Sequence, residues 1–181
     1  VFAQWNKTRS DRIIKTAIAL KGLGNVGASI QSMNEDTLKA VKRKNFTIEK
    51  IVEMQNELKK YKLDEWFSEL IIGLPYETKQ THIEANKKLI DLDFEIWNYN
   101  LHLLSGTEMD TEESRKNYFT KTGWRLHDNC YGIYEGEKIF ELQETVLETH
   151  TLSIEDFRYF RFFHFLQQMM WGKSCLLYTS T

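Results

Sequence analysis

Apolar residues in this chain switch repeatedly between helical spacing and short continuous runs, and this alternation limits the possible folds more than any other feature. Strands are predicted at Val26 to Gln31, Trp66 to Ile72 and Glu95 to Leu103, and helices at Asp11 to Lys21, after Asn34, at Thr47 to Tyr61 and from Thr78 to Asp91. Strands that alternate with helices are typical of βα units around a parallel sheet. The sequence therefore predicts an α/β fold over residues 1–109.

Charge and cysteine content exclude several kinds of partner. Lys and Arg total 24 against 26 for Asp and Glu, with both signs interspersed, so no field attracts nucleic acid or an anionic membrane. No apolar run reaches the length of a membrane span, and residues 1–12 lack the plan of a signal peptide. Cys130 and Cys175 form no metal-binding or disulfide pattern. We therefore expect a cytoplasmic protein.

The alternation ends near Met109, and residues 110–174 are predicted to form a mostly helical extension. A polar helix near Glu112 to Thr120 and a final helix that begins at Ser153 flank an irregular aromatic segment. The aromatic residues of the final helix are interpreted as core, namely Phe157, Phe160, Phe163 and Trp171. Residues 175–181 resemble a translated sequencing adaptor, and the absence of an initiator Met is interpreted as N-terminal truncation.

Polar side chains recur on strands that a parallel sheet would normally bury on both faces. Because side chains alternate across a strand, the residues that share a face are Ser29 with Gln31, Glu69 with Ile71, and Asn98 with Asn100 and His102. A buried carboxylate such as Glu69 needs partners, and a polar ligand at the carboxyl ends of the strands would supply them. These residues could also satisfy one another or face solvent, and the alternation alone leaves both interpretations open.

Two motifs resemble the fourth- and fifth-strand motifs of the radical S-adenosylmethionine (SAM) superfamily. The first is Ser29-Ile30-Gln31-Ser32 followed by Asn34, Leu38 and Arg43, and the second is Ile71-Ile72-Gly73-Leu74-Pro75-Tyr76-Glu77-Thr78. One βα unit separates them, and Ser105-Gly106-Thr107-Glu108 closes the next strand. The resemblance covers about Val26 to Met109 and implies that residues 1–109 are the C-terminal half of a TIM-like (β/α) barrel.

The same resemblance implies a SAM site at the mouth of that barrel. Gln31 and Arg43 fall where such enzymes contact the ribose and carboxylate of SAM, Glu69 falls on the acidic position of the fifth strand, and Ile71 falls where the adenine packs. Ser29 and Asn100 complete the predicted cofactor-binding set. Arginine presents a planar fork of donors that suits a carboxylate.

Members of the superfamily cleave SAM reductively at a [4Fe–4S] cluster, and the resulting 5′-deoxyadenosyl radical acts on a substrate. The resemblance thus implies SAM, a cluster, an electron donor and a small-molecule or other substrate, and it extends to members that use cobalamin. The CxxxCxxC loop that ligates the cluster is absent from this chain, so the chain alone is expected to be inactive. No metal ligand and no catalytic residue is predicted within it.

Two other functions stay open at this point, an ordinary βα-barrel lyase or aldolase and a non-catalytic domain with a SAM-like pocket. A Schiff-base lysine on a strand and a phosphate-cradling glycine loop would support the first, and neither is found. The pattern Gly22-x-Gly24-x-x-Gly27 follows a helix and precedes a strand, so it is interpreted as a helix end and not as a dinucleotide site. His102 and Cys130 are interpreted as structural residues.

Overall fold

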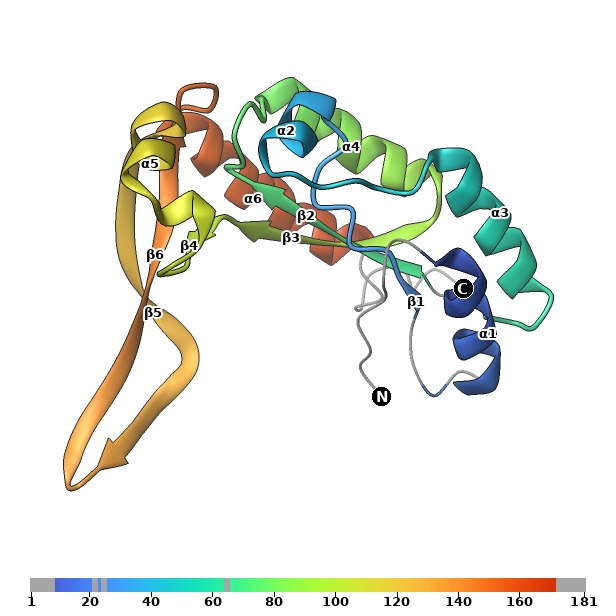
Figure 1. Ribbon diagram of the computed structural model, residues 1–181, viewed down its shortest axis with the longest axis horizontal. Coiled ribbons are helices and arrows are strands. Elements are labelled where there is room, and N and C mark those ends of the chain that lie inside the picture. Colours follow the sequence, from blue (N-terminus) through green and yellow to red (C-terminus); the bar gives the residue numbers. More distant parts are fainter. Residues whose placement is uncertain (1–8, 21–22, 24–25, 64–65, 172–181) are drawn as a thin grey trace.

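The structure is a computed structural model that describes residues 9–20, 23, 26–63 and 66–171. Its elements follow the order α1 (Ser10–Leu20), β1 (Val26–Gly27), α2 (Glu35–Ala40), α3 (Ile48–Lys59), β2 (Trp66–Ile72), α4 (Lys79–Asp91), β3 (Phe94–Asn100), β4 (His102–Leu103), the 3₁₀ helix η1 (Glu108–Asp110), α5 (Glu112–Tyr118), β5 (Phe119–Tyr134), β6 (Glu137–Thr149) and α6 (Ile154–Trp171). Figure 1 shows a helix-covered sheet and a long β hairpin that projects away from it.

Strands β1, β2 and β3 form a parallel sheet in that order, as the alternation of strands and helices predicts. In its register Glu69 lies beside Trp97, and Ile71 lies beside Tyr99. Laterally paired residues point to the same side of a sheet, so these four side chains share one face. Trp97 and Tyr99 are 40% and 42% exposed there, which leaves this face accessible to a ligand.

Helices α1, α3 and α4 contribute to the core on the opposite face of the sheet (Figure 1). Leu70 of β2 and Phe94 of β3 are fully buried in a cluster with Ile13, Ile51 and Leu89 from these helices. Burying an aliphatic or aromatic side chain of this size contributes about 1.5–3 kcal/mol. The helix-covered face therefore stabilises the sheet, while the other face is free for polar residues.

Helices α3 and α4 begin where the sequence predicts. The Thr47 hydroxyl accepts the amide of Lys50, and Thr78 forms a capping box with Thr81. Each cap satisfies an amide that has no partner inside the helix. The cap at Thr78 fixes the start of α4 directly after the turn that leaves β2.

The C-terminal region is built on an antiparallel sheet in the order β4-β6-β5. The residues between β5 and β6, Glu135 and Gly136, both have positive φ, which is typical of a tight hairpin turn. Phe157 and Phe160 of α6 are buried with Val146 of β6 in a second hydrophobic cluster. This cluster packs the extension onto the end of the parallel sheet.

The prediction of a mostly helical extension is wrong. Strands β5 and β6 contain 16 and 13 residues, whereas α5 and α6 contain 7 and 18. The segment predicted to be irregular is the hairpin, in which the rings of Tyr131 and Phe140 stack with centroids 6.2 Å apart. The two predicted helices are confirmed, and Ser153 caps α6 by accepting the amide of Asp156 and donating to its carboxylate.

Two predicted strands also differ from those observed. The first contains only Val26–Gly27 as a strand, followed by a single bridge between Gln31 and Leu70. The third divides at Leu101, whose amide donates to the Ile72 carbonyl of one sheet and whose carbonyl accepts the Val146 amide of the other. Leu101 thus passes the chain from the parallel to the antiparallel sheet.

The described strands form open sheets, so the partial barrel stays a proposal. Gly22 and Gly24, which were predicted to end the first helix, and residues 175–181 lie outside the described residues, as does the side chain of Trp171. None of the described helices is long and apolar enough to cross a membrane.

Candidate functional site

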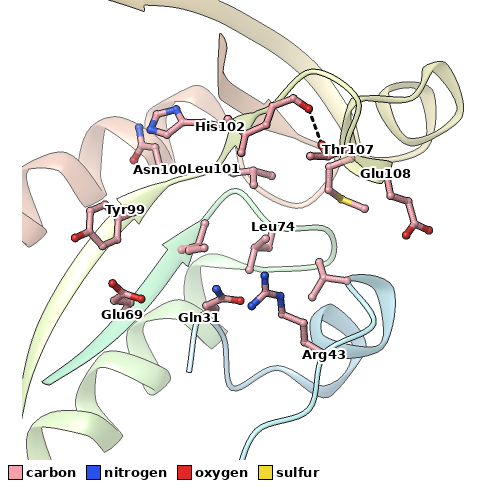
Figure 2. A pocket seen from close by; sticks show the side chains of 14 residues that line it. Gln31, Arg43, Glu69, Leu74, Tyr99, Asn100, Leu101, His102, Thr107 and Glu108 are labelled. Atoms are coloured by element: carbon pink, nitrogen blue, oxygen red, sulfur yellow. Dashed lines mark hydrogen bonds between the residues drawn. The ribbon is translucent and has the colours of Figure 1, made fainter. Parts of the chain in front are cut away.

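A cavity of about 450 Å³ lies at the carboxyl ends of the parallel strands (Figure 2). Its walls come from the segment after β1, the ends of β2 and β3, and the loop before η1. The lining residues are Gln31, Val41, Arg43, Glu69, Ile71, Leu74, Tyr99, Asn100, Leu101, His102, Leu104, Thr107, Glu108 and Met109. Ligands of parallel α/β sheets bind at this end of the strands.

Gln31 lies in this cavity with a left-handed backbone, at a φ of 66°. The Ser32 amide donates to the Ile30 carbonyl at 2.8 Å, which closes a three-residue turn around Gln31. The Gln31 amide donates to the Glu69 carbonyl at 2.6 Å, and its carbonyl accepts the Ile71 amide at 2.8 Å. A non-glycine residue in this conformation is strained by about 1–3 kcal/mol and is often found at functional sites.

Glu69 presents its carboxylate on the accessible face of β2, where it is partly buried. The Ser29 hydroxyl donates to Glu69 Oε2 at 2.8 Å, so Ser29 supports the carboxylate although it does not line the cavity. Burial and the nearby negative charge of Glu69 raise the pKa of Tyr99. The Tyr99 phenol therefore keeps its proton and can donate a hydrogen bond within the site.

Arg43 is an exposed cation at the cavity, following α2 (Figure 2). Its neighbour Lys42 forms an ion pair with Glu108 at 2.5 Å, and both of these side chains are more than half exposed. Among the described residues Arg43 itself makes no side-chain hydrogen bond or ion pair. The Lys42–Glu108 pair therefore neutralises the acidic group near Arg43 and leaves the guanidinium free for an anion.

Glu77 is a buried carboxylate that joins two of the loops around the cavity. The hydroxyls of Ser32 and Thr81 both donate to it, and burial, which outweighs these bonds, raises its pKa. Asn34 Nδ2 also donates to the Tyr76 carbonyl at 2.9 Å. These bonds attach the segment after β1 to the turn before α4, which holds Gln31 in position.

Glu69 and Ile71 share the accessible face of β2 as predicted, but Asn98 of β3 does not lie on that face. Asn98 lies on the helix-covered side, where its amide donates to Asn86 and to Gln167. Tyr99 lines the cavity instead, as the neighbour of Ile71. Asn100 still reaches the cavity from the end of β3.

The structure brings together all but one of the predicted site residues: Gln31, Arg43, Glu69, Ile71 and Asn100 line one cavity, and Ser29 bonds to Glu69. Sequence reasoning assigned no role to Tyr99 or to the loop at 104–109. The Ser105-Gly106-Thr107-Glu108 motif was the available signal for that loop, because Thr107 and Glu108 line the cavity.

No protein-family model and no curated protein matches the chain. Among solved structures, the radical S-adenosylmethionine methyltransferase TsrM from Kitasatospora setae, with tryptophan substrate and the SAM analog aza-SAM bound, is similar at a TM-score of 0.47 and 15% identity. The match covers 81% of this chain and 32% of that chain, so this chain spans about a third of that structure's length. Similarity at this level does not establish a shared fold or function.

The described residues do not fit an iron–sulfur cluster. Cys130 is the one cysteine among them and is partly exposed on β5, not buried as a structural thiol would be. The described part of the chain also contains no group of three or more His, Cys, Asp or Glu side chains that could hold a metal ion. An iron–sulfur cluster would therefore need ligands from outside the described residues.

Proposed function

We propose that the cavity binds SAM and that the chain is the SAM-binding part of a radical SAM enzyme. The observation that carries this proposal is the convergence of the motif residues on one cavity at the carboxyl ends of parallel strands. Gln31 follows β1 and Arg43 follows α2, while Glu69 and Ile71 lie on β2 and Asn100 ends β3. Motif residues that matched the superfamily by chance would not be expected to gather in this way.

The free groups of the cavity suit the polar parts of SAM. The Arg43 guanidinium has no competing partner among the described residues, and its planar fork would hold the methionyl carboxylate in two parallel hydrogen bonds. The Gln31 side chain is also without a hydrogen bond to the described residues, and its amide would bond the ribose hydroxyls. Glu69 keeps acceptor capacity beyond its bond from Ser29, for a hydroxyl or for the ammonium group.

The adenine would lie on the less polar part of the wall. Ile71 and Tyr99 are lateral neighbours on the accessible face, and the exposed Tyr99 ring gives a flat surface on which a base can stack. The aliphatic residues Val41, Leu74 and Leu101 line the same cavity and would exclude water. The cavity thus separates a polar region for the amino acid and sugar from an apolar region for the base.

SAM bound beside a reducing cluster supplies radical chemistry, and the residues of this chain would bind and orient it and shield it from water. The [4Fe–4S] cluster, its electron donor and any cobalamin enter the proposal only through the sequence resemblance. No described residue is assigned to them. The residues of this cavity do not determine which substrate the whole enzyme uses or which reaction it catalyses.

Binding of SAM to the purified chain, measured by isothermal titration calorimetry, tests the proposal. We expect R43Q to weaken SAM binding by about tenfold, which corresponds to about 1.4 kcal/mol of binding free energy. This value is at the lower end for a hydrogen bond to a charged group, because Arg43 is exposed. Q31A should also weaken it. K44Q is the matched control, because Lys44 is an adjacent exposed cation that does not line the cavity.

Circular dichroism of each variant shows whether the fold is retained. Equal SAM affinity for R43Q and K44Q would contradict the assignment of the carboxylate site. The absence of any SAM binding to the wild-type chain would contradict the proposed function as a whole for this cavity.

A further inference from the structure

A second cavity, of about 490 Å³, shares a wall with the first. Tyr99, Asn100 and His102 line both cavities, and the second continues between the base of the β5–β6 hairpin and α6. Its volume lies within the range of roughly 300–1,000 Å³ that is usual for small-molecule sites. None of the motif residues on β1 or β2 lines it, so it is a separate space.

The charged groups of this cavity leave one cation without a counter-ion. Arg125 is engaged by Asp128 at 3.3 Å and by the amide oxygen of Gln143 once that amide is turned to face the guanidinium. Among the described residues, Arg161 of α6 makes no ion pair and no side-chain hydrogen bond. A free guanidinium in a cavity favours an anion with two coplanar oxygens, which is the geometry of a carboxylate.

The histidines of the cavity do not compete for that anion at neutral pH. Burial lowers the pKa of His164 to about 4. Burial and the positive charge of Arg125 lower the pKa of His102, and the backbone of Glu144 opposes this. Both rings are therefore neutral, and Arg161 supplies the unbalanced charge.

His102 also has a buried polar atom, Nδ1, that is not hydrogen-bonded to the described residues. Buried polar atoms are nearly always hydrogen-bonded, by protein, water or ligand. A ligand that fills this cavity could satisfy it, because His102 lines the wall.

The rest of the wall includes a large aromatic surface. Trp124 of β5 is 67% exposed at the cavity, and Leu147 of β6, which is partly buried, lines the same cavity. An indole left exposed at the mouth of a cavity favours a flat apolar group that stacks on it. The cavity thus combines an aromatic surface, a free guanidinium and an unpaired imidazole nitrogen.

We propose that this second cavity is a ligand site for a small aromatic carboxylate, with the carboxylate on Arg161, the ring on Trp124 and a polar group within reach of His102. The inference rests only on the second cavity and holds whether or not the first binds SAM. The shared wall would place such a ligand next to whatever the first cavity holds.

The test is a titration of the purified chain with 3-phenylpropionate at neutral pH, without SAM, followed by the indole N–H signal of Trp124 in ¹H–¹⁵N NMR spectra. Comparison with W124F assigns that signal. We expect a saturable shift, and we expect the neutral 3-phenylpropionamide to bind at least tenfold more weakly. R161Q should weaken carboxylate binding at least tenfold, and R161K should lie between R161Q and wild type.

R158Q is the matched control, because Arg158 lies on the same helix, pairs with Glu155 at 3.6 Å and does not line the cavity. It should bind the carboxylate as the wild type does. The proposal is overturned by a lack of saturable binding of the carboxylate, by equal binding of the amide, or by R161Q binding as well as R158Q while the dispersion of its spectrum shows that it is folded.

Discussion

Acid should weaken the packing of α6 against α4 through two buried histidines. His82 of α4 is 1% exposed, and its Nε2 lies 3.0 Å from Nε2 of His164 on α6. The His82 ring also meets the Phe160 ring edge to face, with centroids 4.7 Å apart. Burial, followed by the proximity of His164, lowers the pKa of His82 to about 3, and burial lowers that of His164 to about 4.

The sign of the effect follows from proton uptake in the two states. In the unfolded chain a histidine has a pKa of about 6.5, so below that pH the unfolded state binds a proton that the folded state does not. The stability that the neutral rings contribute is complete above about pH 6.5 and is lost as the pH falls toward the folded pKa values. Between pH 7 and pH 4, His82 alone should remove about 3 kcal/mol from the free energy of unfolding, and His164 acts in the same direction.

Urea denaturation at pH 7 and pH 4, followed by circular dichroism, measures this loss. The double variant H82Q/H164Q replaces both titratable rings, and H150Q removes an exposed histidine as a control. The double variant should lose less stability between the two pH values than wild type, by about 3 kcal/mol or more. If it loses as much as H150Q does, the two rings are not the acid-sensitive groups and the reasoning is refuted.

Two further substitutions test the supports of the extension and of the first cavity. E144Q should lower the free energy of unfolding by about 2 kcal/mol in urea denaturation at pH 7, because Arg115 donates two hydrogen bonds to the nearly buried carboxylate and holds its pKa at about 2. A loss of less than about 0.5 kcal/mol would contradict this. G73A should lower the free energy of unfolding by about 1 kcal/mol or more beyond the loss in G106A, measured by thermal or urea unfolding. Both glycines have positive φ, but only at Gly73 would a Cβ approach the Phe157 ring, at 3.0 Å, so equal losses would show that the ring moves away freely.

The sequence predicted the parallel sheet well where local signals and burial agree. Strand β2 has the predicted bounds because it lies between a polar segment and the turn at Gly73, and α4 has them because Thr78 caps its start. Such elements are specified by residues close to them in the chain. Their ends can therefore be read without knowledge of the tertiary structure.

The hairpin was not predicted because its outer part has no buried face. The first six residues of β6, from Glu137 to Leu142, are all exposed, so the period-two alternation that marks a half-buried strand is missing. The remaining local signal was the turn, where Glu135-Gly136 supplies two residues of positive φ between Tyr134 and Glu137. A glycine at the second turn position was the only mark of this element near its tip.

The composition of the site depends on register, which a single strand does not reveal. Alternation groups Asn98 with Asn100, but pairing with β2 places Asn98 beside Leu70 and thus toward the helices. The same pairing brings Tyr99 beside Ile71 and into the cavity. Alternation along the strand therefore predicted the candidate residues of β2 correctly. At the centre of β3 it pointed to Asn98, whereas Tyr99 is the residue that lines the cavity.

At Gln31 the backbone conformation, and not the strand register, determines where the side chain points. The register of β1 with β2, Gly27 beside Phe67, would bring Gln31 beside Ile71 in a regular strand, but the observed bridge is to Leu70. Leu70 is fully buried on the helix-covered face, and a regular residue at that bridge would point the same way. The register changes between Ala28, whose amide donates to the Phe67 carbonyl, and Gln31. The left-handed turn at Gln31 then directs its side chain into the cavity, while the bond from Ser32 to Glu77 holds the next residue in the protein interior. The strain is thus localised at the residue whose side chain the proposed ligand would contact, which is where a binding site gains most from a fixed conformation.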